Sequence, residues 1–325
     1  MRIPFPGPAQ VARVVFALAV FHCICTFAAS PGTTQRSFDS PEAAADALAG
    51  AWHGESPDDL VRIFGPGGAK LVVTGDATAD RETRTRLAAE FDVQHRVERK
   101  GNDKAFLILG NDEFPYPIPL VRVAKRWRFD TAAGEQEILD RRIGRDELHA
   151  IEVCRAYVES QREFAAKDAL GNGLHEFARR IASSPGKHDG LYWQAHSGER
   201  ESPFGPLIAD AAAEGYGTAS SEMLSPYQGY FFRILQRQGA NAPGGTLEYV
   251  ANGHMTRGFA LVAYPAKYAD SGIMTFLVNQ DGIVFEKNLG ADTARIARQI
   301  LSFNPDKSWR ATNASVSPTI LRAND

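Results

Sequence analysis

The sequence predicts an α+β protein, built from helices and antiparallel sheets that follow one another along the chain. From Phe38 to Asp130, segments with helix-start signals come first and runs of strand-forming residues come later. From Pro226 to Gly290, five short runs rich in aromatic and β-branched residues are separated by Gly, Pro, Asn and Asp, the pattern of an antiparallel meander. The length of 325 residues fits two domains of ordinary size.

Residues 1–30 have the layout of a secretory signal peptide. Arg2 and Arg13 precede an apolar run from Val14 to Ala29 that ends in small residues, and no acidic residue occurs in this segment. The run is shorter than the ~20 residues that a membrane-spanning helix needs, and His22 interrupts it. We therefore expect cleavage and a periplasmic or secreted protein. The alternative is an uncleaved N-terminal membrane anchor.

Net charge and the number of cysteines bear on two functional classes, nucleic-acid binding and cysteine chemistry. The formal net charge is -3, and removal of residues 1–30 takes away two positive charges and no negative ones, which leaves -5. Such a chain has no bulk electrostatic attraction to nucleic acid. Cys154 would be the one remaining cysteine, so no internal disulfide can form. Its place on the apolar face of a predicted helix favours a core residue over a nucleophile.

The first predicted domain covers residues 38–133. Ser40 and Pro41 are typical of a helix start. The helices are expected at 43–52, 57–64 and 79–91, and the strands at 95–99, 104–109, 118–124 and 126–130. This order resembles the cone-shaped fold of the nuclear transport factor 2 type, which implies a pocket that could bind a small ligand. Its candidate residues are Trp52, His95 and Trp127, each of which also fits a packing or surface role.

The second predicted domain covers residues 134–325. A segment from Glu135 to Arg142 leads through Gly144 to a helix over 145–166, whose apolar residues form one stripe. The five-stranded meander follows over 230–235, 247–251, 259–264, 273–278 and 283–289, with a last helix that carries Ile296, Ile300 and Phe303 on one face and ends at Asn304-Pro305. A long helix followed by a meander resembles the globular part of type IV pilin-like proteins.

In the first run of the meander, Tyr230, Phe232 and Ile234 share one face. The other face carries Arg233 and Arg237, so we expect the first set to face the core.

Between Asp168 and Ser225 the pattern is irregular, but large aromatic residues recur, which indicates ordered loops. Long ordered loops are often functional. The candidate ligand-binding residues in this region are His188, Asp189, Tyr192, Trp193 and His196. The His188-Asp189 pair, with a nearby serine, could also supply parts of a hydrolase in the 184–205 loop. No nucleophile elbow, phosphate-binding loop or dinucleotide fingerprint supports an enzyme.

The stretch from Asp168 to Glu176 is similar to a calcium loop, with Asp168, Asn172 and Glu176 as candidate oxygen ligands. Leu170 stands where the loop needs an oxygen, and Arg179 replaces the bidentate glutamate. A plain turn is therefore the favoured interpretation, calcium the alternative, and no other cofactor is expected.

The chain resembles the bacterial family of unknown function called DUF2950. The matching stretches are 117–121, 127–134, 141–148, 154–158, 184–193, 202–207, 226–235, 258–265 and 275–282. Family members often carry an Asp-rich loop where this chain has 168–176. The resemblance implies a secreted envelope protein and brings no activity and no catalytic residues. We expect a non-enzymatic periplasmic module that binds an envelope protein or a small molecule, with the hydrolase and the ligand-binding cone as alternatives.

Overall fold

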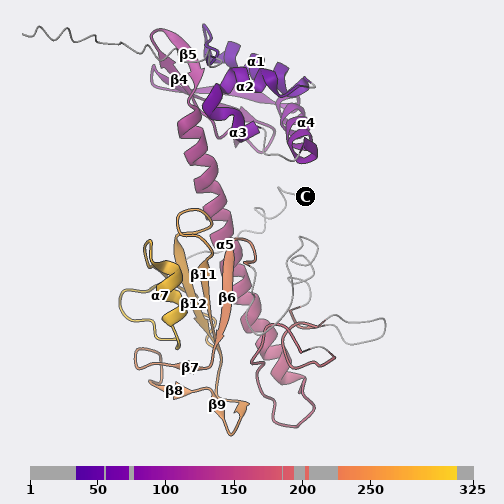
Figure 1. Cartoon of the computed structure of the whole chain (residues 1–325), viewed down its shortest axis with the longest axis vertical. Coiled ribbons are helices and arrows are strands. Elements are labelled where there is room, and N and C mark those ends of the chain that lie inside the picture. Colours follow the sequence, from indigo (N-terminus) through magenta and orange to yellow (C-terminus); the bar gives the residue numbers. More distant parts are fainter. Residues whose placement is uncertain are drawn as a thin grey trace, which may run out of the picture.

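A computed structural model describes residues 34–54, 56–72, 77–184, 186–193, 202–204 and 226–312. The described chain forms two bodies with separate hydrophobic cores, joined by one long helix, α5 (Thr131–Ala166) (Figure 1). Each body contains antiparallel sheet and helices, so the predicted α+β class is confirmed.

Helices open the N-terminal body. They are α1 (Pro41–His53), α2 (Asp58–Phe64), the 3-10 turn η1 (Pro66–Gly68), α3 (Ala69–Val72) and α4 (Ala77–Val93). Helix α1 begins where the hydroxyl of Ser40 accepts a hydrogen bond from the amide of Ala43 at 3.0 Å. Pro41 fits its first turn because the amide hydrogen that proline lacks would have no helical partner there.

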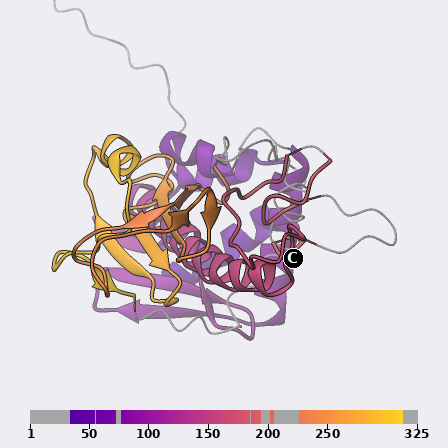
Figure 2. The same ribbon diagram turned by 90° about the horizontal axis from the view of Figure 1, so that it is seen from below.

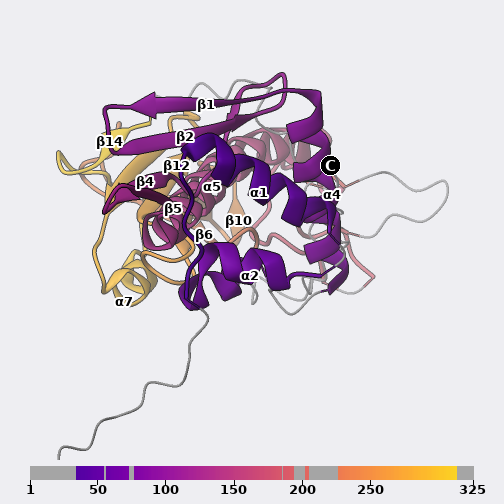
Figure 3. The ribbon, with the colours of Figure 1, turned by 90° about the horizontal axis from the view of Figure 1, so that it is seen from above.

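The N-terminal sheet follows the helices. Its strands are β1 (His95–Lys100), β2 (Lys104–Leu109), β3 (Phe114–Pro115), β4 (Leu120–Val123) and β5 (Arg126–Phe129). The order is β1-β2-β4-β5, with β3 paired to β2, close to the predicted strand ranges. Helices α1 and α4 pack against this sheet (Figure 3). The resemblance to the cone-shaped fold stays a prediction.

Helix α5 is continuous for 36 residues and runs through Gly144. Its first turns belong to the N-terminal body, because the hydroxyl of Thr131 donates to the carbonyl of Phe64 at 2.8 Å and Arg141 donates to the carbonyl of Pro115 at 2.9 Å. Its later turns supply the core of the C-terminal body. The predicted division at residue 133/134 thus falls at the start of a helix that both bodies share.

The main sheet of the C-terminal body has the order β14-β13-β12-β11-β6. Its strands are β6 (Tyr230–Leu235), β11 (Ala260–Pro265), β12 (Met274–Asn279), β13 (Phe285–Asn288) and β14 (Arg310–Ala311). Helix α5 covers one face and α7 (Thr293–Gln299) the other (Figure 2). Both faces are therefore buried, which explains strands that are apolar on both sides.

The predicted second strand, 247–251, is not part of the main sheet. It divides into β8 (Leu247–Glu248), which pairs with β7 (Arg237–Gln238), and β9 (Val250–Ala251), which pairs with β10 (His254–Met255). Between the two ribbons Tyr249 is fully buried, and its hydroxyl donates to the side-chain oxygen of Gln238 at 3.0 Å. Burial of this ring draws the segment out of the meander, and β14 supplies the fifth strand instead.

The predicted last helix is shorter than expected. Helix α7 ends at Gln299, because Ile300 adopts extended dihedrals. Phe303 is fully buried but lies outside the helix, where its amide donates to the carbonyl of Arg237 at 2.9 Å.

Candidate functional site

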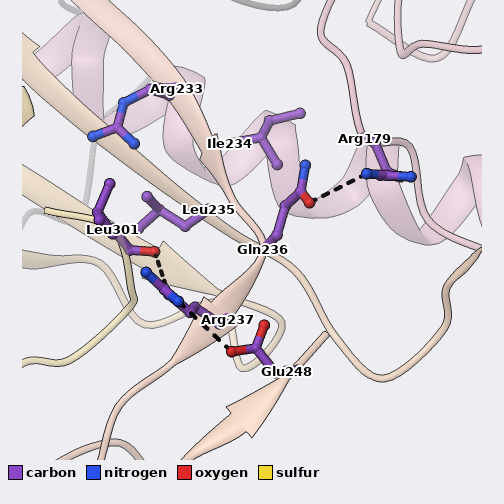
Figure 4. Close-up of a pocket in the computed structure, with 8 residues that line it drawn as sticks. All are labelled: Arg179, Arg233, Ile234, Leu235, Gln236, Arg237, Glu248 and Leu301. Carbon is purple, nitrogen blue, oxygen red and sulfur yellow. Dashed lines mark hydrogen bonds and ion pairs between the residues drawn. The ribbon is translucent and has the colours of Figure 1, made fainter. Parts of the chain in front are cut away.

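A hollow of about 390 Å³ lies at the end of β6, where the chain leaves the main sheet for the β7–β8 ribbon (Figure 4). We call it the arginine side. It is lined by Arg179, Arg233, Ile234, Leu235, Gln236, Arg237, Glu248 and Leu301. A second hollow of about 480 Å³, the Glu176 side, shares Arg179 and Gln236 with the first. The two sides together form what we call the polar hollow.

The β7–β8 pairing sets the geometry of the arginine side. Arg237 and Glu248 are direct partners in the ladder, and the guanidinium Nη1 lies 3.8 Å from the carboxylate Oε1. The Nε atom of Arg237 also donates to the carbonyl of Leu301 at 3.3 Å. Both contacts are long, and both charged side chains are about half exposed or more. Arg237 therefore keeps donors that a ligand could use.

Arg179 reaches the polar hollow from the irregular segment after α5. Its Nη1 donates to the carbonyl of Gly253 at 3.3 Å. Its Nη2 donates to the side-chain oxygen of Gln236 at 3.4 Å (Figure 4). These bonds are near the upper limit for N–H···O geometry, so they hold the side chain only loosely.

Arg233 has a different role. Its Nη2 donates to the carbonyl of Ala297 at 3.0 Å and to that of Ile300 at 2.8 Å, at the C-terminal end of α7. A cation at this position gives the last carbonyls of the helix a charged donor and complements the helix dipole. Arg233 thus fixes α7 on the sheet. Tyr230, Phe232 and Ile234, on the other face of β6, are buried, as predicted.

A buried carboxylate defines the Glu176 side. The side chain of Glu176 is 6% exposed, and its Oε1 receives hydrogen bonds from Asn172 Nδ2 and from His254 Nδ1, the latter at 3.0 Å. The neighbouring segment is tied to α5 by the fully buried Gln161, whose Nε2 donates to the carbonyl of Ala178 and whose Oε1 accepts from its amide, both at 2.8 Å. Glu176 is thus held in place from two directions.

Asp189 lines the same side but closes its own loop. Its Oδ1 accepts from the amide of Ser184 at 2.6 Å and its Oδ2 from the hydroxyl at 2.8 Å, with Arg180 3.8 Å away. Burial alone would raise the pKa of Asp189, but these hydrogen bonds and the nearby guanidinium outweigh it and hold the pKa below its usual value. Asp189 is a stable anion in the wall of the polar hollow.

The other predicted ligand-binding residues do not take part in the hydrogen bonds of Asp189. His188 stacks on the buried Trp193 with ring centroids 4.4 Å apart. Tyr192 is half-buried, and its backbone pairs with that of Ile181 and Ser183. His196 lies outside the described residues.

The predicted calcium loop closes through its own backbone. The two carboxylate oxygens of Asp168 accept from the amides of Asn172 and Gly173, and the side-chain oxygen of Asn172 accepts from the amide of Leu174. Across the described ranges, no group of three or more His, Cys, Asp or Glu side chains is placed to hold a metal ion. Calcium binding stays a prediction that none of these contacts supports.

The residues proposed for a pocket in the N-terminal body are used in packing. Trp52 and Trp127 are buried, and Trp52 meets Tyr116 edge to face at 5.3 Å. His95 is exposed and stacks on Phe91 at 3.6 Å.

The sequence interpretation missed Arg179, Gln236, Arg237 and Glu248 as site residues. One signal was present: Arg233 and Arg237 occur on the same face of an aromatic strand. That spacing gave no indication of what the two guanidiniums would meet, because their neighbours come from residues 179, 248 and 297–301.

The fold and the polar hollow define an α+β protein of two bodies with a charged hollow in the second. The model of the family described as "Protein of unknown function (DUF2950)" matches residues 35–312, and the chain belongs to this family. No curated protein and no solved structure matches the chain. Within the residues that the structure describes, no helix is both long enough and apolar enough to cross a membrane.

Proposed function

We propose that the protein is a non-enzymatic binding module of the cell envelope, and that the polar hollow is its binding surface. The observation that carries the proposal is the arginine side. It holds three arginines against one glutamate, a formal charge of +2, in a chain whose net charge is -3. Guanidinium groups with unused donors in a concave surface are suited to bind an anionic group.

The loop contacts favour binding over hydrolysis. A hydrolase built on the 184–205 loop would need an imidazole held between a carboxylate and a nucleophile. Asp189 instead bonds the amide and hydroxyl of Ser184, while His188 stacks on Trp193. These side chains thus support loop structure.

Export to the envelope is part of the proposal. It rests on the composition of residues 1–30, with two arginines, an apolar run and small residues at its end. N-terminal sequencing of protein from the periplasmic fraction tests it. We expect a new N-terminus close to residue 30. An intact N-terminus in the membrane fraction would instead show an uncleaved anchor.

A thermal-shift screen of the purified protein against metals, sugars, organic acids and peptides, followed by cross-linking in intact cells, tests the binding function. A ligand that binds only the folded state raises the melting temperature by mass action. We expect a shift, or a cross-linked partner, that is lost when Arg179 and Arg237 are both changed to Gln. A flat screen together with no cross-linked partner would refute the proposal.

A further inference from the structure

We infer that the polar hollow binds a small hydroxylated carboxylic acid of the sugar-acid type, with the carboxylate at the arginine side and the hydroxyls at the Glu176 side. The inference rests on the proposed binding function and names its ligand class. It follows from the opposite hydrogen-bonding character of the two sides.

The arginine side offers donors. Arg179 and Arg237 are exposed, and their contacts to Gln236, Gly253, Leu301 and Glu248 are all 3.3 Å or longer. The planar fork of a guanidinium matches the two oxygens of a carboxylate. A ligand carboxylate can replace the side chain of Glu248, because this side chain is 63% exposed and its contact with Arg237 is long, at 3.8 Å. The formal charge of +2 on this side then falls as the anion binds.

The Glu176 side offers acceptors. Both hydrogen bonds to Glu176 reach Oε1, and among the described residues none reaches Oε2. The second oxygen can accept from a ligand hydroxyl without loss of the bonds that hold the side chain. His254 donates through Nδ1 to Glu176, which leaves its Nε2 for a second hydroxyl. Gln236 stands between the two sides and lines both.

The rim and the size fit a sugar ring. Two large apolar side chains are exposed here: Leu301 on the arginine side is 56% exposed, and Leu170 on the Glu176 side is 41% exposed. They can cover the apolar C–H face of a ring whose hydroxyls point inward. The volumes of about 390 and 480 Å³ lie within the range of about 300–1,000 Å³ typical of small-molecule sites.

Isothermal titration of the purified protein with glucuronate, glucose and propionate tests the inference. Glucose lacks the carboxylate that would bind the arginine side, and propionate lacks the hydroxyls that would bind the Glu176 side. We expect glucuronate to bind at least about tenfold more tightly than either, since each comparison removes at least one hydrogen-bonded group. No heat of binding for glucuronate up to about 10 mM, or equal affinity for propionate, would overturn it.

Four variants locate the site. Arg179→Gln and Glu176→Gln are each expected to weaken glucuronate binding about tenfold, and Arg179→Lys less, because lysine keeps the charge but loses the fork. Arg295→Gln removes an exposed arginine of α7 that pairs with Asp292, and it should bind like the wild type. Each variant's melting temperature is measured, and a variant that is unfolded is replaced by Arg237→Gln. Unchanged affinity in all the folded variants of the hollow would overturn the inference.

The two proposals can fail separately. If glucuronate does not bind but a cross-linked partner still depends on Arg179 and Arg237, the sugar-acid inference is wrong and the binding function stands. If a peptide or amino acid binds more tightly than glucuronate and depends on the same residues, the ligand class is again wrong. If no ligand or partner depends on these residues, both proposals fall.

Discussion

The Nδ1 atom of His254 lies 3.0 Å from Oε1 of Glu176, and these two residues come from segments 78 positions apart. Their contact joins the β9–β10 ribbon to the loop that follows α5. Next to it, the amide of Phe177 donates to the carbonyl of Met255 at 2.8 Å. The polar hollow therefore lies on a junction between two irregular segments, and its carboxylate serves both the junction and the proposed site.

Replacement of Glu176 by alanine should destabilise this junction. The substitution removes the acceptor of two hydrogen bonds, so we expect the free energy of unfolding to fall by about 1–3 kcal/mol in urea titrations. Glu176→Gln keeps one acceptor oxygen and should lose less. Glu163→Ala, which removes an exposed ion pair with Lys167 on α5, should cost less than about 1 kcal/mol. An equal loss at both glutamates would contradict the role given to Glu176.

Asp146 predicts a pH dependence of stability. Desolvation raises the pKa of this buried carboxyl on α5, more than the nearby Arg145, His149 and Arg142 lower it. A raised folded-state pKa means that the folded state binds the proton more tightly. Asp146 therefore adds stability below the unfolded pKa of about 3.9, and that contribution is lost as the pH rises through the folded pKa.

The variant Asp146→Asn removes this titration. We expect it to be more stable than the wild type at neutral pH, with a difference that shrinks toward zero or reverses near the unfolded pKa of about 3.9. Urea unfolding at several pH values measures the difference. A difference that grows as the pH falls would reject the assigned direction of the pKa shift.

Cys154 should be unreactive in the folded protein. Its side chain is fully buried, and burial raises the pKa of the thiol to about 12, so almost no thiolate is present at pH 8. We expect iodoacetamide to label the peptide that contains Cys154 only across the urea unfolding transition, as followed by mass spectrometry. Rapid labelling without denaturant would show that this part of the core opens.

The α+β class and the N-terminal strands were predictable because local signals agree with tertiary structure there. The turn at Gly101, for example, adopts a φ of +70°, which glycine permits, and it joins two strands whose ranges the sequence predicts. The absence of 247–251 from the main sheet was not predictable, since it depends on tertiary packing around the buried ring of Tyr249. The polar hollow was not predictable either, because Arg179, Arg237 and Glu248 meet only through the packing of the finished fold.

Two glycines of α5 should respond in opposite ways to alanine, which tests both the continuity of the helix and its attachment to the N-terminal body. A Cβ atom at Gly144 would meet no atom within 4 Å, so Gly144→Ala gains helix propensity and should stabilise the protein by about 0.5–1 kcal/mol. A Cβ atom at Gly134 would lie 2.6 Å from Cγ1 of Ile118, too close for carbon atoms. Gly134→Ala must push the helix from the N-terminal sheet and should cost about 1–3 kcal/mol despite the same gain in propensity. Urea unfolding of both variants measures the contrast. Stabilisation by both would mean that α5 does not pack on Ile118, and destabilisation by both would mean that the helix is interrupted at Gly144.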